Sequence, residues 1–143
     1  GRRAPTLLTP HDREFERVAG PLGTDRVAAV RRAAAELGVT VLLKGQATIV
    51  AGPDGRVLVN PTGSGWLATA GTGDVLSGLG GALLAAGLDP LRAAAAAAYL
   101  HGLAGSRAAG AADRIGTGSG APITAMQVVA AIPGAIRALG SGG

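Results

Sequence analysis

Residues 67–76 form a segment in which two glycines come shortly before an acid, Asp74. Glycine adopts backbone dihedrals that other residues avoid, so Gly71 and Gly73 let a ligand approach the main chain closely. The apolar residues after Asp74 recur at helical spacing, which predicts that a helix begins in this segment. The first N–H groups of a helix have no intrahelical partner, and the helix dipole is positive there. The segment therefore predicts an anion site, for a phosphate or a developing oxyanion, with an acid beside it.

The acid of this segment could have either of two roles. An acid in the first turn of a helix can cap free N–H groups, or it can act as a general base on a nearby substrate hydroxyl. For Asp74 the sequence alone leaves both roles open.

Lys44 is a lone lysine in a chain whose 13 basic residues are otherwise arginines, and it ends an apolar run at 39–44. A compact ammonium group at a strand end suits a phosphate site, although a lysine can also simply end a strand. If Lys44 and the glycine-rich loop lie at the same end of a sheet, they can bind a nucleotide and place Asp74 near a substrate hydroxyl. The motif Gly-x-x-x-x-Gly-Lys-Ser/Thr is absent from the sequence, so this is not a P-loop protein.

The two histidines have different expected roles. His11 lies between a proline-bounded extended run at 5–10 and a short helix, a position from which residues commonly contact ligands in α/β folds. A lone histidine is more often structural, and its position alone does not decide between the two roles. His101 lies within the apolar stretch 91–109 and is expected to be a packed core residue with a backbone or water partner.

Composition limits the classes of protein and of site. The 143 residues fit one domain, expected to cover 1–143, and the 48% hydrophobic and 2% aromatic content predicts a core of Ala, Val and Leu. Without cysteine there is no disulfide, thiolate nucleophile or cysteine zinc site. The net charge of +4 comes from arginines scattered along predicted helices, so we expect no nucleic-acid partner. No apolar run approaches the roughly 18–20 residues of a membrane span, and we expect a soluble, cytoplasmic protein without a membrane partner.

The hydrophobic pattern predicts an α/β fold with a mixed, mostly parallel sheet flanked by helices. A strand, two helices and a second strand in succession imply a right-handed crossover and a parallel pair. The Pro-Asp-Gly turn that follows predicts a hairpin of two further strands. Strands are expected at 5–10, 39–44, 48–51 and 56–59, and helices at 11–18, at 24–38 with Thr24 as N-cap, and at 74–87, 89–109 and 124–139.

Five motifs of the chain belong together. They are Leu-Thr-Pro-His at 8–11 with Glu14 and Phe15, Leu-Lys-Gly at 43–45, the glycine-rich segment extended to 67–78, His-Gly at 101–102, and Ile-Thr-Ala at 123–125. Together they closely resemble the ADP-dependent NAD(P)H-hydrate dehydratases of the ribokinase-like superfamily. Gly-Thr-Gly-Asp alone would indicate only the superfamily, whereas Thr-Pro-His with Glu-Phe narrows the resemblance to this branch.

The resemblance implies an enzyme that repairs NADH and NADPH hydrated on the nicotinamide ring. It implies ADP, or else ATP, as cosubstrate and Mg²⁺ as the accompanying ion; phosphorylation makes the ring hydroxyl a leaving group, which is eliminated as phosphate. By resemblance, His11 and Asp74 bind the hydrated dinucleotide, with Asp74 as the catalytic base, and backbone N–H groups at 71–73 stabilise the transferred phosphoryl group. The implied nucleotide-binding residues are Lys44, Gly45, Gln46, Ala47, Thr48 and Gly73.

The resemblance covers only the C-terminal half of the family's domain. We therefore expect the chain to form homo-oligomers, or to need an N-terminal half or an epimerase domain, and activity of the chain alone is in question. Two alternatives remain open: a ribokinase-like kinase for a vitamin or thiazole, and a nucleotide-binding chain without catalytic activity.

Overall fold

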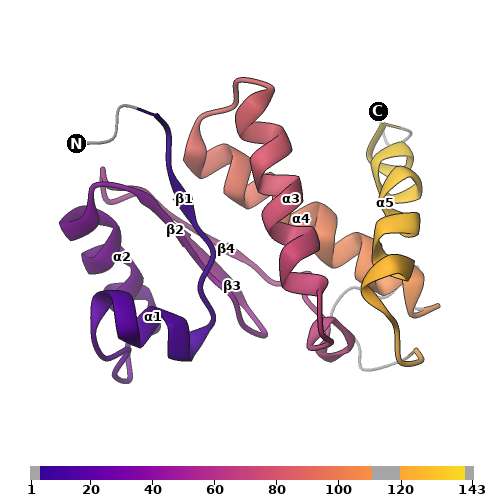
Figure 1. Ribbon diagram of the computed structural model, residues 1–143, viewed down its shortest axis with the longest axis horizontal. Helices are drawn as coiled ribbons and strands as arrows, with labels where there is room; N and C mark the ends of the chain where they lie inside the picture. The colour runs from indigo at the N-terminus through magenta and orange to yellow at the C-terminus, as the bar shows by residue number, and fades with distance from the viewer. Residues whose placement is uncertain (1–3, 111–119, 141–143) are drawn as a thin grey trace.

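A computed structural model describes residues 4–110 and 120–140 as one mixed sheet with helices on both faces. Helices α1 and α2 cover one face of the sheet, α3 and α4 cover the other, and α5 packs beyond them against α4 (Figure 1). The strands are β1 (Leu7–Leu8), β2 (Thr40–Leu43), β3 (Thr48–Ala51) and β4 (Val57–Asn60). The helices are α1 (Asp12–Ala19), α2 (Arg26–Leu37), α3 (Thr72–Ala85), α4 (Pro90–Ala108) and α5 (Ala125–Gly140), with a short 3-10 turn, η1 (Gly65–Leu67).

The sheet has the strand order β1-β2-β3-β4. Strands β1 and β2 run parallel, with Leu7 opposite Thr40, as the predicted crossover requires. The pairs β2–β3 and β3–β4 are antiparallel. The sheet is therefore mixed as predicted, but the expectation of a mostly parallel sheet is wrong for the described residues, because the hairpin contributes two of the three pairings.

Two apolar clusters fill the two faces of the sheet. Residues of β2 alternate between them, since successive side chains of a strand point to opposite faces. Val41 and Leu43 pack with α1 and α2, whereas Leu42 packs with α3 and α4. Burial on both faces explains why the run at 39–44 is continuously apolar rather than alternating.

The start of α2 differs from the prediction by one residue. The N-cap is Asp25 rather than Thr24, and its carboxylate accepts a hydrogen bond from the Ala28 N–H at 2.9 Å. Both residue types can cap a helix, so the sequence did not separate two adjacent candidates. The other end is as predicted, since Gly38 takes a left-handed conformation with φ of 64°.

Helix α4 approaches the segment that leads into the glycine-rich loop very closely. A Cβ at Gly102 would overlap the Thr62 Oγ1, and one at Gly105 would lie 2.6 Å from a methyl carbon of Leu67. Only glycine fits at such contacts. Residues 62–67 are thereby held against α4, which fixes where α3 begins.

No helix in the described ranges is both long enough and apolar enough to cross a membrane.

Candidate functional site

A cavity of about 570 Å³ opens where β2 ends and α3 begins. This volume lies within the range of about 300–1,000 Å³ that is usual for small-molecule sites. Its wall comes from the turn after β2, the end of β4, the segment around η1, the first turn of α3 and the middle of α4. The lining residues are His11, Lys44, Gly45, Gln46, Thr48, Asn60, Gly63, Ser64, Gly65, Leu67, Ala68, Thr69, Thr72, Gly73, Leu76, Ala98, His101 and Gly102.

Lys44 links the two predicted halves of this site. Its backbone N–H donates to the carbonyl of Pro10 at 2.9 Å, which places the end of β2 beside the residue before His11. Its Nζ lies 3.4 Å from the position that a Cβ would take at Gly73. The ammonium group therefore lies at the first turn of α3, as the predicted arrangement requires.

The N-terminus of α3 is open to an anion. Gly71 is its N-cap residue, with φ of 85°, and offers no side chain to cap the free N–H groups. The Thr72 N–H donates to the Thr69 carbonyl at 3.3 Å, whereas the Gly73 N–H has no hydrogen-bond partner among the described residues. Within the expected anion hole at 71–73, Gly73 thus offers a free donor and Thr72 does not.

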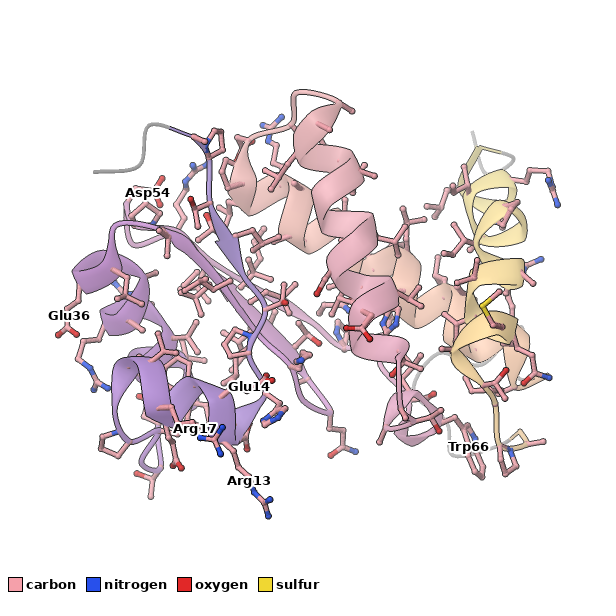
Figure 2. All side chains as sticks on the ribbon, in the orientation of Figure 1. Arg13, Glu14, Arg17, Glu36, Asp54 and Trp66 are labelled. Atoms are coloured by element: carbon pink, nitrogen blue, oxygen red, sulfur yellow. The ribbon has the colours of Figure 1, made fainter. Side chains whose placement is uncertain are left out.

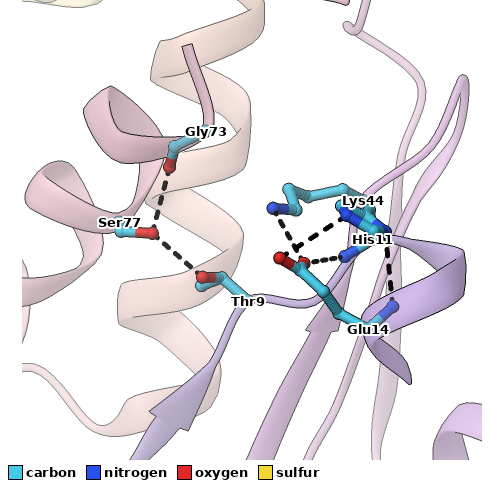
Figure 3. A network of polar contacts seen from close by, with 6 residues as sticks. All are labelled: Thr9, His11, Glu14, Lys44, Gly73 and Ser77. Carbon is cyan, nitrogen blue, oxygen red and sulfur yellow. Dashed lines mark hydrogen bonds and ion pairs between the residues drawn. The ribbon is translucent and has the colours of Figure 1, made fainter. Parts of the chain in front are cut away.

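A chain of hydroxyl groups fixes α3 against the end of β1 (Figure 3). The Ser77 Oγ donates to the Gly73 carbonyl at 3.0 Å, as serines in helices often do. Its proton is thereby used, so the hydrogen bond of 2.9 Å between the Thr9 and Ser77 hydroxyls has Thr9 as donor. This contact holds the first turn of α3 close to the loop that carries His11.

Asp74 has a free carboxylate in the described part of the chain. Its side chain is exposed and makes no hydrogen bond or ion pair there, although its backbone N–H donates to the Gly71 carbonyl at 3.1 Å. The carboxylate therefore does not cap α3. Asp74 lies in the same helical turn as Gly73 but does not line the cavity wall.

His11 has a structural role, which is one of the two roles that its position in the sequence left open. It is the N-cap of α1, where its Nδ1 accepts from the Glu14 N–H at 3.3 Å and its own N–H donates to the Glu14 Oε2 at 2.8 Å. These reciprocal bonds form a capping box. Because Nδ1 accepts, the neutral ring carries its proton on Nε2. His11 also lines the cavity, so a ligand could meet this residue as well.

The structure brings most of the predicted site residues together and leaves two outside the wall. Ala47 and Asp74 do not line the cavity, although each is next to a residue that does. The predicted residues that line it are His11, Lys44, Gly45, Gln46, Thr48 and Gly73.

His101 is the buried residue that was predicted, with 7% of its surface exposed, but it also lines the cavity. Burial lowers the pKa of the imidazole, and a hydrogen bond with the Thr72 backbone opposes this in part, so the ring is neutral at pH 7. Its Nε2 has no hydrogen-bond partner in the ranges that the structure describes. The sequence placed His101 only on an apolar helix, and nothing in that pattern indicated which cavity the helix would border.

Glu14 was missed as a site residue, although it is part of the quoted motif. Its Oε2 lies 3.4 Å from the Lys44 Nζ. The only signal in the sequence is its place three residues after His11, the spacing of a capping box. Contact with Lys44 arises only when β2 lies beside the start of α1.

Comparisons with known proteins identify the family of the chain. The family model described as NAD(P)H-hydrate dehydratase matches residues 1–122. The bifunctional NAD(P)H-hydrate repair enzyme Nnr of Mycobacterium leprae is 55% identical over 139 residues, which are 96% of this chain and 28% of that protein. The ADP-dependent (S)-NAD(P)H-hydrate dehydratase of Neisseria meningitidis is 50% identical over 102 residues, 68% of this chain and 34% of that protein.

A solved structure points to the same enzyme family. The ADP/ATP-dependent NAD(P)H-hydrate dehydratase of Bacillus subtilis, co-crystallised with ATP and Mg²⁺ and soaked with CoA, superposes with a TM-score of 0.82 at 34% identity. The match covers 96% of this chain and 50% of that one, so the chain spans about half the length of the solved enzyme. The chain belongs to the NAD(P)H-hydrate dehydratase family.

Proposed function

We propose that this chain contributes the nucleotide site and the catalytic base of an ADP-dependent dehydratase that returns hydrated NADH and NADPH to NADH and NADPH. The observation that carries the proposal is the Lys44 ammonium group beside the open N-terminus of α3, with the free carboxylate of Asp74 in the same turn. A cation and a helix N-terminus together favour a phosphate, and an unpaired carboxylate is suited to accept a proton.

In this proposal Asp74 takes the proton of the hydroxyl on the hydrated nicotinamide ring. The hydroxyl oxygen then forms a bond to the terminal phosphorus of ADP, and the bond from that phosphorus to the bridging oxygen breaks, releasing AMP. Lys44 and the Gly73 N–H stabilise negative charge on the transferred group. The bond from the ring carbon to the phosphate oxygen then breaks and releases phosphate, while the adjacent ring carbon loses a proton to solvent water, which restores the double bond.

The residues present also agree with Mg²⁺ arriving with the nucleotide rather than in a site of its own. In the described part of the chain, no group of three or more His, Asp or Glu residues could hold a metal ion. Among the described residues no carboxylate lines the cavity, so phosphate oxygens and water would supply most ligands. Such an ion would neutralise phosphate charge and help to orient the nucleotide.

Product analysis tests the proposed function. Hydrated NADH and ADP are incubated with a complete enzyme that carries this segment, and AMP, free phosphate and the absorbance of the reduced nicotinamide are followed. The dehydratase gives all three. A kinase would leave a stable phosphorylated product with no free phosphate, and a chain that only binds nucleotide would give none; either result would contradict the proposal.

We further propose that the chain associates with itself, through the surface beside β1. The outer edge of β1 has no strand partner in the described residues. Next to it lies a cavity of about 260 Å³ with mainly apolar walls, which include Leu8, Val18 and Leu37. Val18 is 57% exposed and Leu37 is 41% exposed. Unpaired strand edges and exposed apolar surface both promote association.

Light scattering after size-exclusion chromatography is expected to show oligomers or aggregates of the chain, and Val18→Ser should reduce them. Val59→Ser is the matched control, because Val59 is 54% exposed and lies on β4 at the other edge of the sheet. A monodisperse monomer with one sharp unfolding transition would refute the association.

A further inference from the structure

Lys44 places a positive charge where the protein is already positive. Its Nζ lies 3.4 Å from the Cβ position of Gly73, in the first turn of α3. The N-terminus of a helix carries a partial positive charge, and none of the described side chains caps α3. An ammonium group in this place is unfavourable unless an anion accompanies it.

Glu14 supplies that anion in the structure (Figure 3). Its Oε2 lies 3.4 Å from the Lys44 Nζ and also accepts from the His11 N–H at 2.8 Å. The hydrogen bond from the His11 backbone, followed by the charge of Lys44, lowers the pKa of Glu14, so the carboxylate is ionised at neutral pH. One carboxylate therefore contacts both the N-terminal end of α1 and the cation of the cavity.

The contact with Lys44 is open to exchange. The Glu14 side chain is 47% exposed and that of Lys44 is 28% exposed. Exposed ion pairs of this kind contribute little to stability, so a ligand anion can replace one partner at little cost. The bond from the His11 N–H does not depend on Lys44, so α1 keeps its cap if the ion pair opens.

We propose that Glu14 is a positioning residue that holds the Lys44 ammonium group at Gly73 in the empty cavity, and that a nucleotide phosphate replaces the Glu14 carboxylate as its partner. This proposal rests on the proposed function, because it takes the incoming anion to be the phosphate of the nucleotide. Glu14 then keeps Lys44 in place before binding and weakens phosphate binding by competition. Weaker binding also favours release of the AMP and phosphate that the reaction forms.

Glu14→Gln removes the charge but keeps an oxygen that can accept from the His11 N–H. In magnesium-free buffer, calorimetric titration with ADP should give a Kd roughly threefold to tenfold lower than for the unsubstituted chain, as expected when one like charge near the phosphate is removed. Asp54→Asn is the matched control. Asp54 is 48% exposed and pairs with Arg56 in the hairpin, outside the cavity lining, so its substitution should leave the Kd unchanged.

Because Lys44 is a single lysine, an amine-reactive label located by mass spectrometry reports on this one side chain. Glu14→Gln should speed its labelling in the absence of ADP, whereas loss of a helix cap alone would lower the melting temperature and leave labelling unchanged. ADP should protect Lys44 in both proteins. If ADP fails to protect Lys44 in the unsubstituted chain, the proposed nucleotide site is wrong, and this proposal with it. If ADP protects Lys44 but Glu14→Gln leaves affinity and labelling unchanged, or weakens affinity, only the role of Glu14 is wrong.

Discussion

In a complete enzyme that carries this segment, Asp74→Asn is expected to lower dehydratase turnover about a hundredfold or more, the usual range for removal of a general base, and to leave the melting temperature nearly unchanged. Asparagine has the size of aspartate and suits a helix N-terminus about as well, but it cannot accept a proton at neutral pH. The Asp74 carboxylate makes no hydrogen bond or ion pair in the described residues, so its replacement breaks no contact there. Loss of its charge beside the phosphate site should leave ADP affinity equal or tighter.

Asp89→Asn is the matched control for this variant. The Asp89 carboxylate caps α4 by accepting from the Arg92 N–H at 3.2 Å, so the same chemical change is made at a true cap. Turnover of this control should equal that of the unsubstituted protein. An Asp74→Asn variant that keeps most of its turnover would rule Asp74 out as the base.

Lys44→Ala is expected to weaken ADP binding by about 1.5–3 kcal/mol, the usual cost of losing a charge-assisted hydrogen bond. Lys44→Arg should restore affinity poorly, because a planar guanidinium group would have to fit where the ammonium lies 3.4 Å from the Cβ position of Gly73. Calorimetric titration of the three proteins with ADP measures both effects.

Arg56→Ala controls for the loss of a positive charge, since Arg56 pairs with Asp54 in the hairpin and does not line the cavity. Its affinity for ADP should match that of the unsubstituted chain. If the Lys44→Ala variant binds ADP as tightly as the unsubstituted chain, Lys44 does not bind phosphate and only ends the strand β2.

The fold could be predicted where one pattern decided the structure. The apolar run at 39–44 is typical of a strand buried on both faces, and β2 is such a strand. The alanine-rich run after Asp89 gave α4 with a buried face. Prediction was less accurate where two neighbouring residues could cap a helix equally well, as Thr24 and Asp25 can at the start of α2. The predicted share of parallel strand pairs was too high. The crossover gives one parallel pairing, whereas the strands of the hairpin take part in two antiparallel pairings.

One part of the site could be predicted from the sequence, namely that Lys44 and the glycine-rich loop bind one ligand if both lie at the same end of the sheet. This reasoning placed Lys44 beside the start of α3, as the structure shows. It could not find residues whose place depends on packing. Glu14 reaches Lys44 only because β2 lies beside the start of α1, and His101 borders the cavity only because glycines bring α4 close to residues 62–67.

The side chains on the outer surface show how the charges are distributed. Figure 2 labels Arg13 and Arg17 on α1, Glu36 on α2 and Asp54 in the hairpin, all on the α1 and α2 side of the sheet. The two arginines and two acids are spread over three elements rather than gathered in one basic surface.

The central claim is that a nucleotide phosphate binds between Lys44 and the first turn of α3. Titration of the ¹⁵N-labelled chain with ADP, followed by NMR, tests it most directly, because the Gly73 N–H has no partner among the described residues and a bound phosphate would give it one. The largest amide shifts are expected at 44–48 and 71–74, with Gly73 among them. Shifts absent from these segments, or confined to the apolar cavity beside β1, would contradict it.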